Sequence, residues 1–169
     1  KSHWDVTLNI GGTLVHALVS HPTPPVFDTA EDRNGKRNHD EIRFWKDYIN
    51  GATYMYDDAG TFGGLAANAP FVIMGDQNAD PLAGDSYQSA INQLLTDPLI
   101  NDGAAHRPRN NGGSRAEQTS PNAGDPEFDT ADFANASPGN LRADYVLPSV
   151  TGLTPTSGAV FWLVPSDPL

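Results

Sequence analysis

The sequence contains no cysteine, which excludes a disulfide framework and any thiolate metal site. Basic residues are also scarce, because 10 Lys and Arg stand against 21 Asp and Glu, for a formal net charge of −11. A charge of this sign opposes a broad electrostatic grip on nucleic acid. No apolar run approaches the roughly 20 residues that cross a bilayer. We therefore expect no membrane span.

No secretory leader is recognisable, and the first residue is Lys1 rather than Met. We therefore expect a mature product, a trimmed chain or a fragment. Its length of 169 residues, 38% of them hydrophobic, is enough for one domain with its own core. The content of 16 Gly and 14 Pro indicates a loop-rich globular chain.

Hydrophobic periodicity predicts several strands and helices. Residues 4–10 alternate apolar and polar side chains, Gly11 and Gly12 suit a hairpin turn, and residues 13–19 are apolar on both faces, as in a central strand. Within that strand we expect His16 to be a packed core histidine. Further predicted elements are a helix that begins at an Asn38–Glu41 capping box and ends near Gly51, a second helix from Asp85 or Ser86 to Leu95, and strands at 71–74, 145–149 and 159–164.

The stretch Phe71–Pro81 combines a short buried strand with polar chemistry. Gly75 lets the chain turn where the apolar run stops, and Asp76 and Asn78 follow at once. The ends of strands are where α/β sheets place ligands, and an oxygen-rich pair suits a hard cation or a phosphoryl oxygen. Gly-Asp-x-Asn is equally good turn chemistry, so the residues alone leave both interpretations open.

Other candidates lie at similar positions. His21 follows the second strand, either as a proton-transfer group or as a surface histidine beside a proline turn. Asp144 enters a later apolar strand, where a carboxylate must be solvated or paired. The acidic loop at 28–41 offers Asp32 and Asn34 as weaker metal ligands, although Ala30 at the first loop position disfavours an EF-hand.

Three segments in this order resemble the endonuclease/exonuclease/phosphatase superfamily: a strand that ends in His21, then Gly75-Asp76-Gln77-Asn78, then Arg142-Ala143-Asp144-Tyr145-Val146. Residues 21–43 are similar to a bacterial branch that includes phytase-like and nuclease-like proteins. The resemblance implies an α/β fold of the α+β kind, a two-sheet sandwich with its site at one end of the sheets. It covers nearly the whole chain.

By this resemblance His21 contacts the scissile phosphate, Asp76 activates water or holds the metal, and Asn78 stabilises phosphoryl oxygens. Asp144 would orient a later histidine. The resemblance also implies a divalent cation, Mg²⁺ with Ca²⁺ or Mn²⁺ as alternatives. Arg37 and Arg142 are the candidate substrate-binding cations.

The chain departs from the family pattern at both ends. The family's early metal-binding Glu has no match, and its closing Ser-Asp-His is not found. We interpret Ser166-Asp167-Pro168 as an accidental likeness within a loop and expect the true closing motif to lie beyond Leu169. We therefore expect residues 1–169 to be one domain that is incomplete, a fragment of a larger catalytic domain, and weakly active or inactive alone. An edge-strand dimer or association with a missing fragment would then cover exposed strands.

Two functions remain open from the sequence. The first is a metal-dependent phosphoesterase for a phosphomonoester or phosphodiester, and the second is a non-catalytic module that binds an ion or a partner through the acidic loop. Within the first, nuclease and phosphatase are not separated, although the net charge of −11 favours a small phosphorylated substrate over nucleic acid. A secreted or periplasmic location is favoured over a cytoplasmic one.

Overall fold

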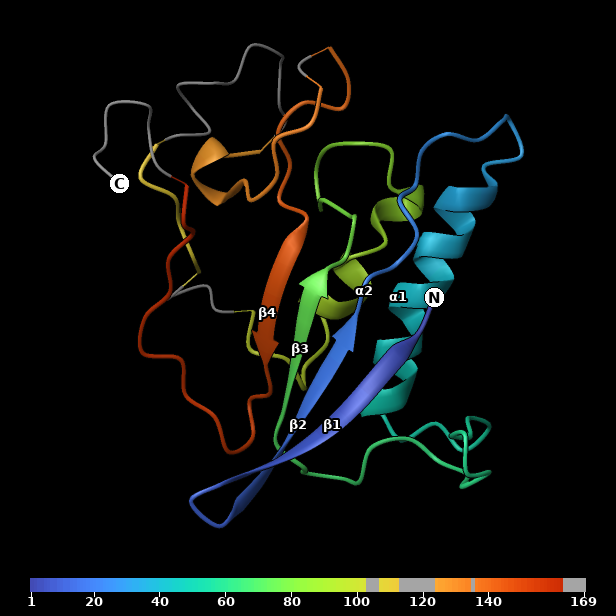
Figure 1. The fold of residues 1–169 in the computed structure, drawn as a ribbon, viewed down its shortest axis with the longest axis vertical. Coiled ribbons are helices and arrows are strands. Elements are labelled where there is room, and N and C mark those ends of the chain that lie inside the picture. The colour runs from blue at the N-terminus through green and yellow to red at the C-terminus, as the bar shows by residue number, and fades with distance from the viewer. Residues whose placement is uncertain (103–106, 113–123, 135, 163–169) are drawn as a thin grey trace.

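The computed structural model describes residues 1–102, 107–112, 124–134 and 136–162. Its centre is a four-stranded sheet in the order β1-β2-β3-β4. The strands are β1 (His3–Ile10), β2 (Thr13–Ser20), β3 (Phe71–Asp76) and β4 (Asp144–Pro148). β1 and β2 form an antiparallel hairpin, β2 and β3 run parallel, and β4 returns antiparallel to β3. β3 therefore ends beside the start of β4 (Figure 1).

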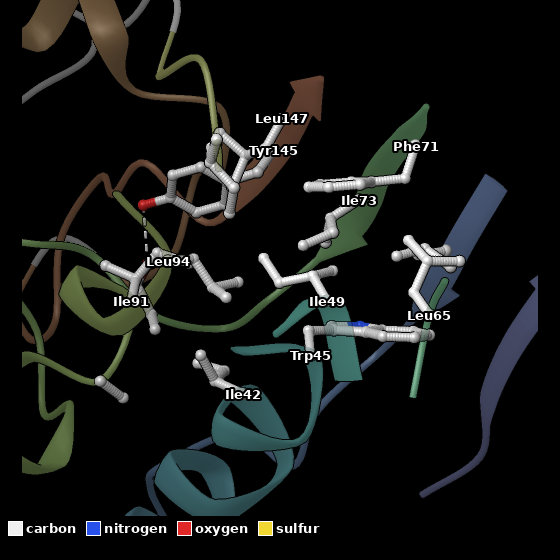
Figure 2. Packing of buried hydrophobic residues seen from close by; sticks show 14 residues of the cluster. Ile42, Trp45, Ile49, Leu65, Phe71, Ile73, Ile91, Leu94, Tyr145 and Leu147 are labelled. Carbon is white, nitrogen blue, oxygen red and sulfur yellow. Dashed lines mark hydrogen bonds between the residues drawn. The ribbon is translucent and has the colours of Figure 1, made fainter. Parts of the chain in front are cut away.

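Helix α1 (Arg33–Ile49) is the crossover that joins the parallel strands β2 and β3. Its buried apolar residues, Ile42, Trp45 and Ile49, recur at helical spacing and therefore form one stripe. This stripe packs against Phe71 and Ile73 of the sheet (Figure 2). The short helix α2 (Asn92–Leu95) adds Leu94 to the same core, and the 3₁₀ turns η1 (Tyr87–Ser89) and η2 (Pro126–Phe128) lie in loops.

The opposite face of the sheet is also apolar, and its β1 part is exposed. On β1 the side chains of Trp4, Val6, Leu8 and Ile10 share this face, and they are 64%, 43%, 43% and 60% exposed. A sheet with one face on helices and a second apolar face is half of a layered α/β structure. The expected α/β fold is thus confirmed, and the described residues contain one sheet of a sandwich.

Four predicted details were wrong, three of which concern α1, His16 and the last strand. α1 begins at Arg33, not at Asn38, because Asp32 occupies the N-cap position and Asn38 lies buried inside the helix. His16 is half-buried instead of packed in the core, and its Nδ1 lies 2.8 Å from an Asp5 carboxylate oxygen. Residues 159–162 form no strand, and residues 163–164 lie outside the described residues.

The second predicted helix is broken. Gln88 has a positive φ of 50° inside η1, so the segment forms η1 and the single turn of α2 in place of one continuous helix. In the parts of the chain that the structure describes, no helix has the length and apolar character needed to cross a membrane.

Candidate active site at the strand ends

Three strand ends place three predicted site residues in one row. The last parallel pair between β2 and β3 is Val19 with Met74, so His21 and Asp76 follow two residues later side by side. The Nε2 atom of His21 lies 3.4 Å from Oδ2 of Asp76. Asp144 is the direct cross-strand partner of Asp76, because β4 begins where β3 ends. The structure thus brings His21, Asp76 and Asp144 together.

Gly75 allows this close arrangement. Its φ is +134°, a conformation that side chains with a Cβ rarely adopt, and an added Cβ would lie 2.2 Å from the carbonyl oxygen of Ser20. The end of β3 can therefore approach the end of β2 only with glycine at this position. The sequence suggested a turn here, and the backbone approach explains why that turn needs this glycine.

Asn78 completes the turn and bridges to the neighbouring loop. Its backbone N–H donates to Oδ1 of Asp76 at 2.8 Å, and its side-chain Nδ2 donates to the carbonyl of Pro22 at 3.1 Å. The turn interpretation is therefore correct for the backbone. It leaves Oδ2 of Asp76 facing His21, so the same carboxylate both orders the turn and takes part in the row.

The pKa of Asp76 is raised above its ordinary value. Partial burial is the largest cause, and the nearby carboxylate of Asp144 adds to it, whereas the Asn78 N–H and His21 act in the opposite direction. Two carboxylates held side by side at the end of a sheet repel one another. A cation between or beside them would relieve this repulsion.

Beneath the row lies a buried polar layer that the sequence did not reveal as part of the site. Asn38 is fully buried, and its Nδ2 donates to the carbonyls of Thr23 and Gln77, both at 2.9 Å. One side chain of α1 therefore ties the loop after β2 to the loop after β3. Ser20 accepts a hydrogen bond from Trp45 Nε1 at 2.8 Å in the same layer. The available signal was the apolar stripe itself, since Asn38 continues the spacing of Ile42, Trp45 and Ile49.

Arg37 lies near this layer but is held by a carboxylate. Its Nε lies 3.1 Å from Glu41, which also accepts from the backbone N–H of Thr23 at 2.6 Å and from the Lys1 α-ammonium. Burial would raise the pKa of Glu41, but the hydrogen bonds from Thr23 and from the Lys1 α-ammonium outweigh it and hold that pKa below its ordinary value. Glu41 thus joins α1 to the loop after His21, and no contact joins Arg37 to His21 or Asp76 among those of the described residues.

Arg142 is buried on the other side of the row. Its guanidinium stacks on the ring of Tyr145, 4.4 Å from the centroid, and its backbone N–H donates to Asp80. Burial lowers the pKa of the guanidinium. Arg142 and Asp144 both line a cavity of about 450 Å³ between β4 and the segment 153–159.

Asp32 and Asn34 lie at the start of α1, where Asp32 is the N-cap and Asn34 is in the first turn. The backbone N–H of Asn34 donates to Asp28, and its side-chain amide donates to the carbonyl of Val26. These contacts organise the loop internally. Within the described ranges, no group of three or more His, Cys, Asp or Glu side chains is placed to hold a metal ion.

The donor chemistry of the row nevertheless fits a hard divalent cation. Asp76 and Asp144 supply carboxylate oxygens from paired positions. Mg²⁺ is commonly held by one or two carboxylates, with the remaining positions taken by water and substrate phosphate oxygens.

The described residues thus form a mixed α/β sheet with helices on one face and an acid–histidine row at its strand ends. The chain belongs to the Endonuclease/Exonuclease/phosphatase family, whose model matches residues 3–167. Members of this family generally use divalent metals.

Two solved structures share this fold. Sphingomyelinase C from Streptomyces griseocarneus is 19% identical with a TM-score of 0.53, and the match covers 92% of this chain and 44% of that one. A β-hairpin deletion mutant of beta toxin from Staphylococcus aureus is 12% identical with a TM-score of 0.52, covering 95% and 49%. The chain therefore spans just under half the length of either structure. No curated protein matches it in sequence.

Proposed function

We propose that this chain forms part of the catalytic domain of a divalent-metal-dependent phosphoesterase, which hydrolyses a phosphomonoester or phosphodiester with an activated water. The observation that carries the proposal is the row of His21, Asp76 and Asp144 across three adjacent strand ends. Turn formation alone does not require a histidine and two carboxylates from three strands to converge.

In this proposal each residue acts through atoms that the structure places at the row. His21 Nε2, when protonated, donates to a phosphoryl oxygen, and Asp76 orients the attacking water. Asn78 donates one amide proton to Pro22, and its second amide proton donates to a phosphoryl oxygen. Arg142 contributes positive charge, and Arg37 would have to leave Glu41 to do so.

Asp76 and Asp144 would hold the divalent cation, for which Mg²⁺ is the first choice and Ca²⁺ or Mn²⁺ the alternatives. When bound, such an ion offsets charge that develops on the phosphoryl oxygens. Asp144 would also orient a histidine, as the family resemblance implies.

The net charge of −11 supports a small phosphorylated substrate over nucleic acid as the partner. A secreted or periplasmic location and a phytase-like or nuclease-like bacterial origin belong to the same proposal. Because two family residues, a metal-binding Glu and a general-base His, match no position here, residues 1–169 alone are expected to be weakly active.

The test uses the protein that the gene encodes in full, assayed on a generic phosphodiester and a generic phosphomonoester with Mg²⁺, Ca²⁺ or Mn²⁺. Asp76→Asn should lower kcat/KM at least about 100-fold, since it removes the carboxylate proposed to orient the attacking water and to hold the cation. The matched control is Asp58→Asn, an exposed position in the segment between α1 and β3. This segment runs at the end of the sheet opposite the row (Figure 1).

Two results would overturn the proposal. One is the absence of hydrolysis of both esters with all three metals. The other is hydrolysis that Asp76→Asn and Asp58→Asn leave equally unchanged. Binding of an ion through the acidic loop at 28–41 would then be the function to measure.

A further inference from the structure

A second cavity, of about 710 Å³, opens directly beside the row. Asn78 lies on its wall, so the cavity begins where the proposed phosphate site ends. Volumes of this size are typical of sites for small organic ligands. Its apolar walls come from the loop after β2 and from the segment before β4, namely Pro24, Pro25, Val26, Phe27, Phe133, Pro138 and Leu141.

The charge of this cavity disfavours substrates that carry more than one phosphate group. Among its described lining residues there is no Lys, Arg or His, and two are carboxylates, Asp80 and Asp85. Asp80 is engaged by three backbone N–H groups, those of Leu82, Ala83 and Arg142. A second phosphate group on the substrate would therefore meet no cation here, and it would face negative charge.

Phe27 provides an independent indication. Its φ is +61°, a strained conformation for a bulky aromatic residue, and its side chain is 97% exposed. Neither local backbone preference nor packing of the core explains a phenylalanine at this position. Strained residues with no packing role cluster at ligand sites.

We propose that this cavity binds an uncharged apolar substituent, aliphatic or aromatic, of a phosphate ester whose phosphate lies at His21, Asp76 and Asn78. The inference rests on the proposed phosphoesterase function and assigns its substrate class. Phe27 lies at the mouth and would cover the bound substituent, while Phe133 and Leu141 form the wall. Substrates with several phosphates are disfavoured.

The experiment measures binding separately from turnover. Methyl-, butyl- and octylphosphonate, which have no ester bond to hydrolyse, are titrated by calorimetry into the full-length protein with Mg²⁺. Each methylene that becomes fully buried should tighten binding about fourfold. We expect butylphosphonate to bind at least about tenfold more tightly than methylphosphonate. The matched ligand 3-phosphonopropionate, which ends in a carboxylate, should show no such gain.

Two variants locate the effect. Phe27→Asn removes the ring and places a residue that tolerates positive φ, so the fold is kept. It should reduce the butyl-to-methyl affinity ratio at least about threefold, as expected if the ring covers one or two methylenes. The matched control is Phe62→Asn, another exposed phenylalanine, which packs on Tyr56 outside the cavity. It should leave the ratio unchanged.

A second experiment distinguishes a membrane lipid from a soluble ester as the source of the apolar group. Co-sedimentation with phosphatidylcholine vesicles that Phe27→Asn abolishes would assign a lipid ester, and no co-sedimentation would assign a soluble one. Either result supports the inference when the chain-length series holds.

The inference fails if affinity is equal along the alkyl series, or if Phe27→Asn and Phe133→Asn both keep the wild-type ratio. Failure of the phosphoesterase proposal looks different. In that case the full-length protein would hydrolyse no ester, whether or not the phosphonates bind in order of chain length.

Discussion

Replacing Asn38 by Ala should both destabilise the protein and impair its site. Asn38 is fully buried, and its Nδ2 is shared by the carbonyls of Thr23 and Gln77. These carbonyls belong to the two loops that carry His21 and Asn78. Removal of the amide therefore unties the loops from α1 and from each other.

The magnitude follows from three contributions. Two buried carbonyls lose their donor, and each such loss costs about 1–3 kcal/mol. Against this, Oδ1 of Asn38 is itself buried without a hydrogen-bond partner. Removing that oxygen recovers about 1–3 kcal/mol, and Ala is a better helix former than Asn by up to about 0.7 kcal/mol. The expected net loss in the free energy of unfolding is about 2 kcal/mol.

Urea denaturation of the full-length protein measures this loss, and kcat/KM on a phosphoester measures the loosened site. The matched control is Asn50→Ala, because Asn50 Nδ2 also makes two hydrogen bonds, to Lys46 and Asp97, but Asn50 is exposed. Water can replace the Asn50 amide as the donor to these two partners, so Asn50→Ala should lower the free energy of unfolding by less than about 1 kcal/mol. Equal losses for the two variants would refute the argument from burial.

Three further predictions concern the row, its glycine and the open sheet face. Asp76→Asn should stabilise the protein at pH 7. Burial raises the pKa of folded Asp76 above the ordinary 3.8, so the ionised carboxylate destabilises the fold at pH 7 and the neutral amide does not. Urea denaturation should show this gain at pH 7 and no gain below about pH 3.8, where the carboxyl group is neutral in both states. Gly75→Ala should lower the free energy of unfolding by about 1–3 kcal/mol more than Gly12→Ala does. Both glycines have positive φ, but only a Cβ at Gly75 would meet a backbone oxygen. Equal melting temperatures for the two variants would contradict this prediction. Residues 1–169 should self-associate through the exposed apolar face of β1, which sedimentation velocity measures. Val6→Lys should weaken this self-association, whereas Thr7→Lys, on the other face of β1, should not. Self-association that persists in Val6→Lys would instead indicate pairing through the β1 edge.

The four strands of the sheet were predictable because each carries its own local signal. The period-2 alternation of residues 4–10 and the apolar run that ends before Gly75 are local features, and the structure has strands at both places. The α/β class was implied by the family resemblance, and the helical stripe between these strands agrees with it. The ends of the predicted strands were enough to place His21, Asp76 and Asp144 at strand ends.

Other features depend on contacts that no local pattern contains. Asn38 three residues before Glu41 has the form of a capping box, yet both side chains bond across to Thr23, 15 and 18 residues away in the chain. The apolar cavity beside Asn78 is built from the loop after β2 and from the segment before β4, which are distant in sequence. Composition could not reveal it, because its apolar residues are scattered among prolines and polar loops.

Strand direction explains why the row forms at this end of the sheet. β2 and β3 are parallel, so their final residues meet, and β4 is antiparallel, so its first residue meets the same edge. Asp144 at the entry of β4 is therefore equivalent in position to Asp76 at the exit of β3. If β4 ran parallel to β3, Asp144 would lie at the far end and Pro148 would face Asp76. The order of three segments in the sequence thus brings the carboxylates together only because the last strand reverses.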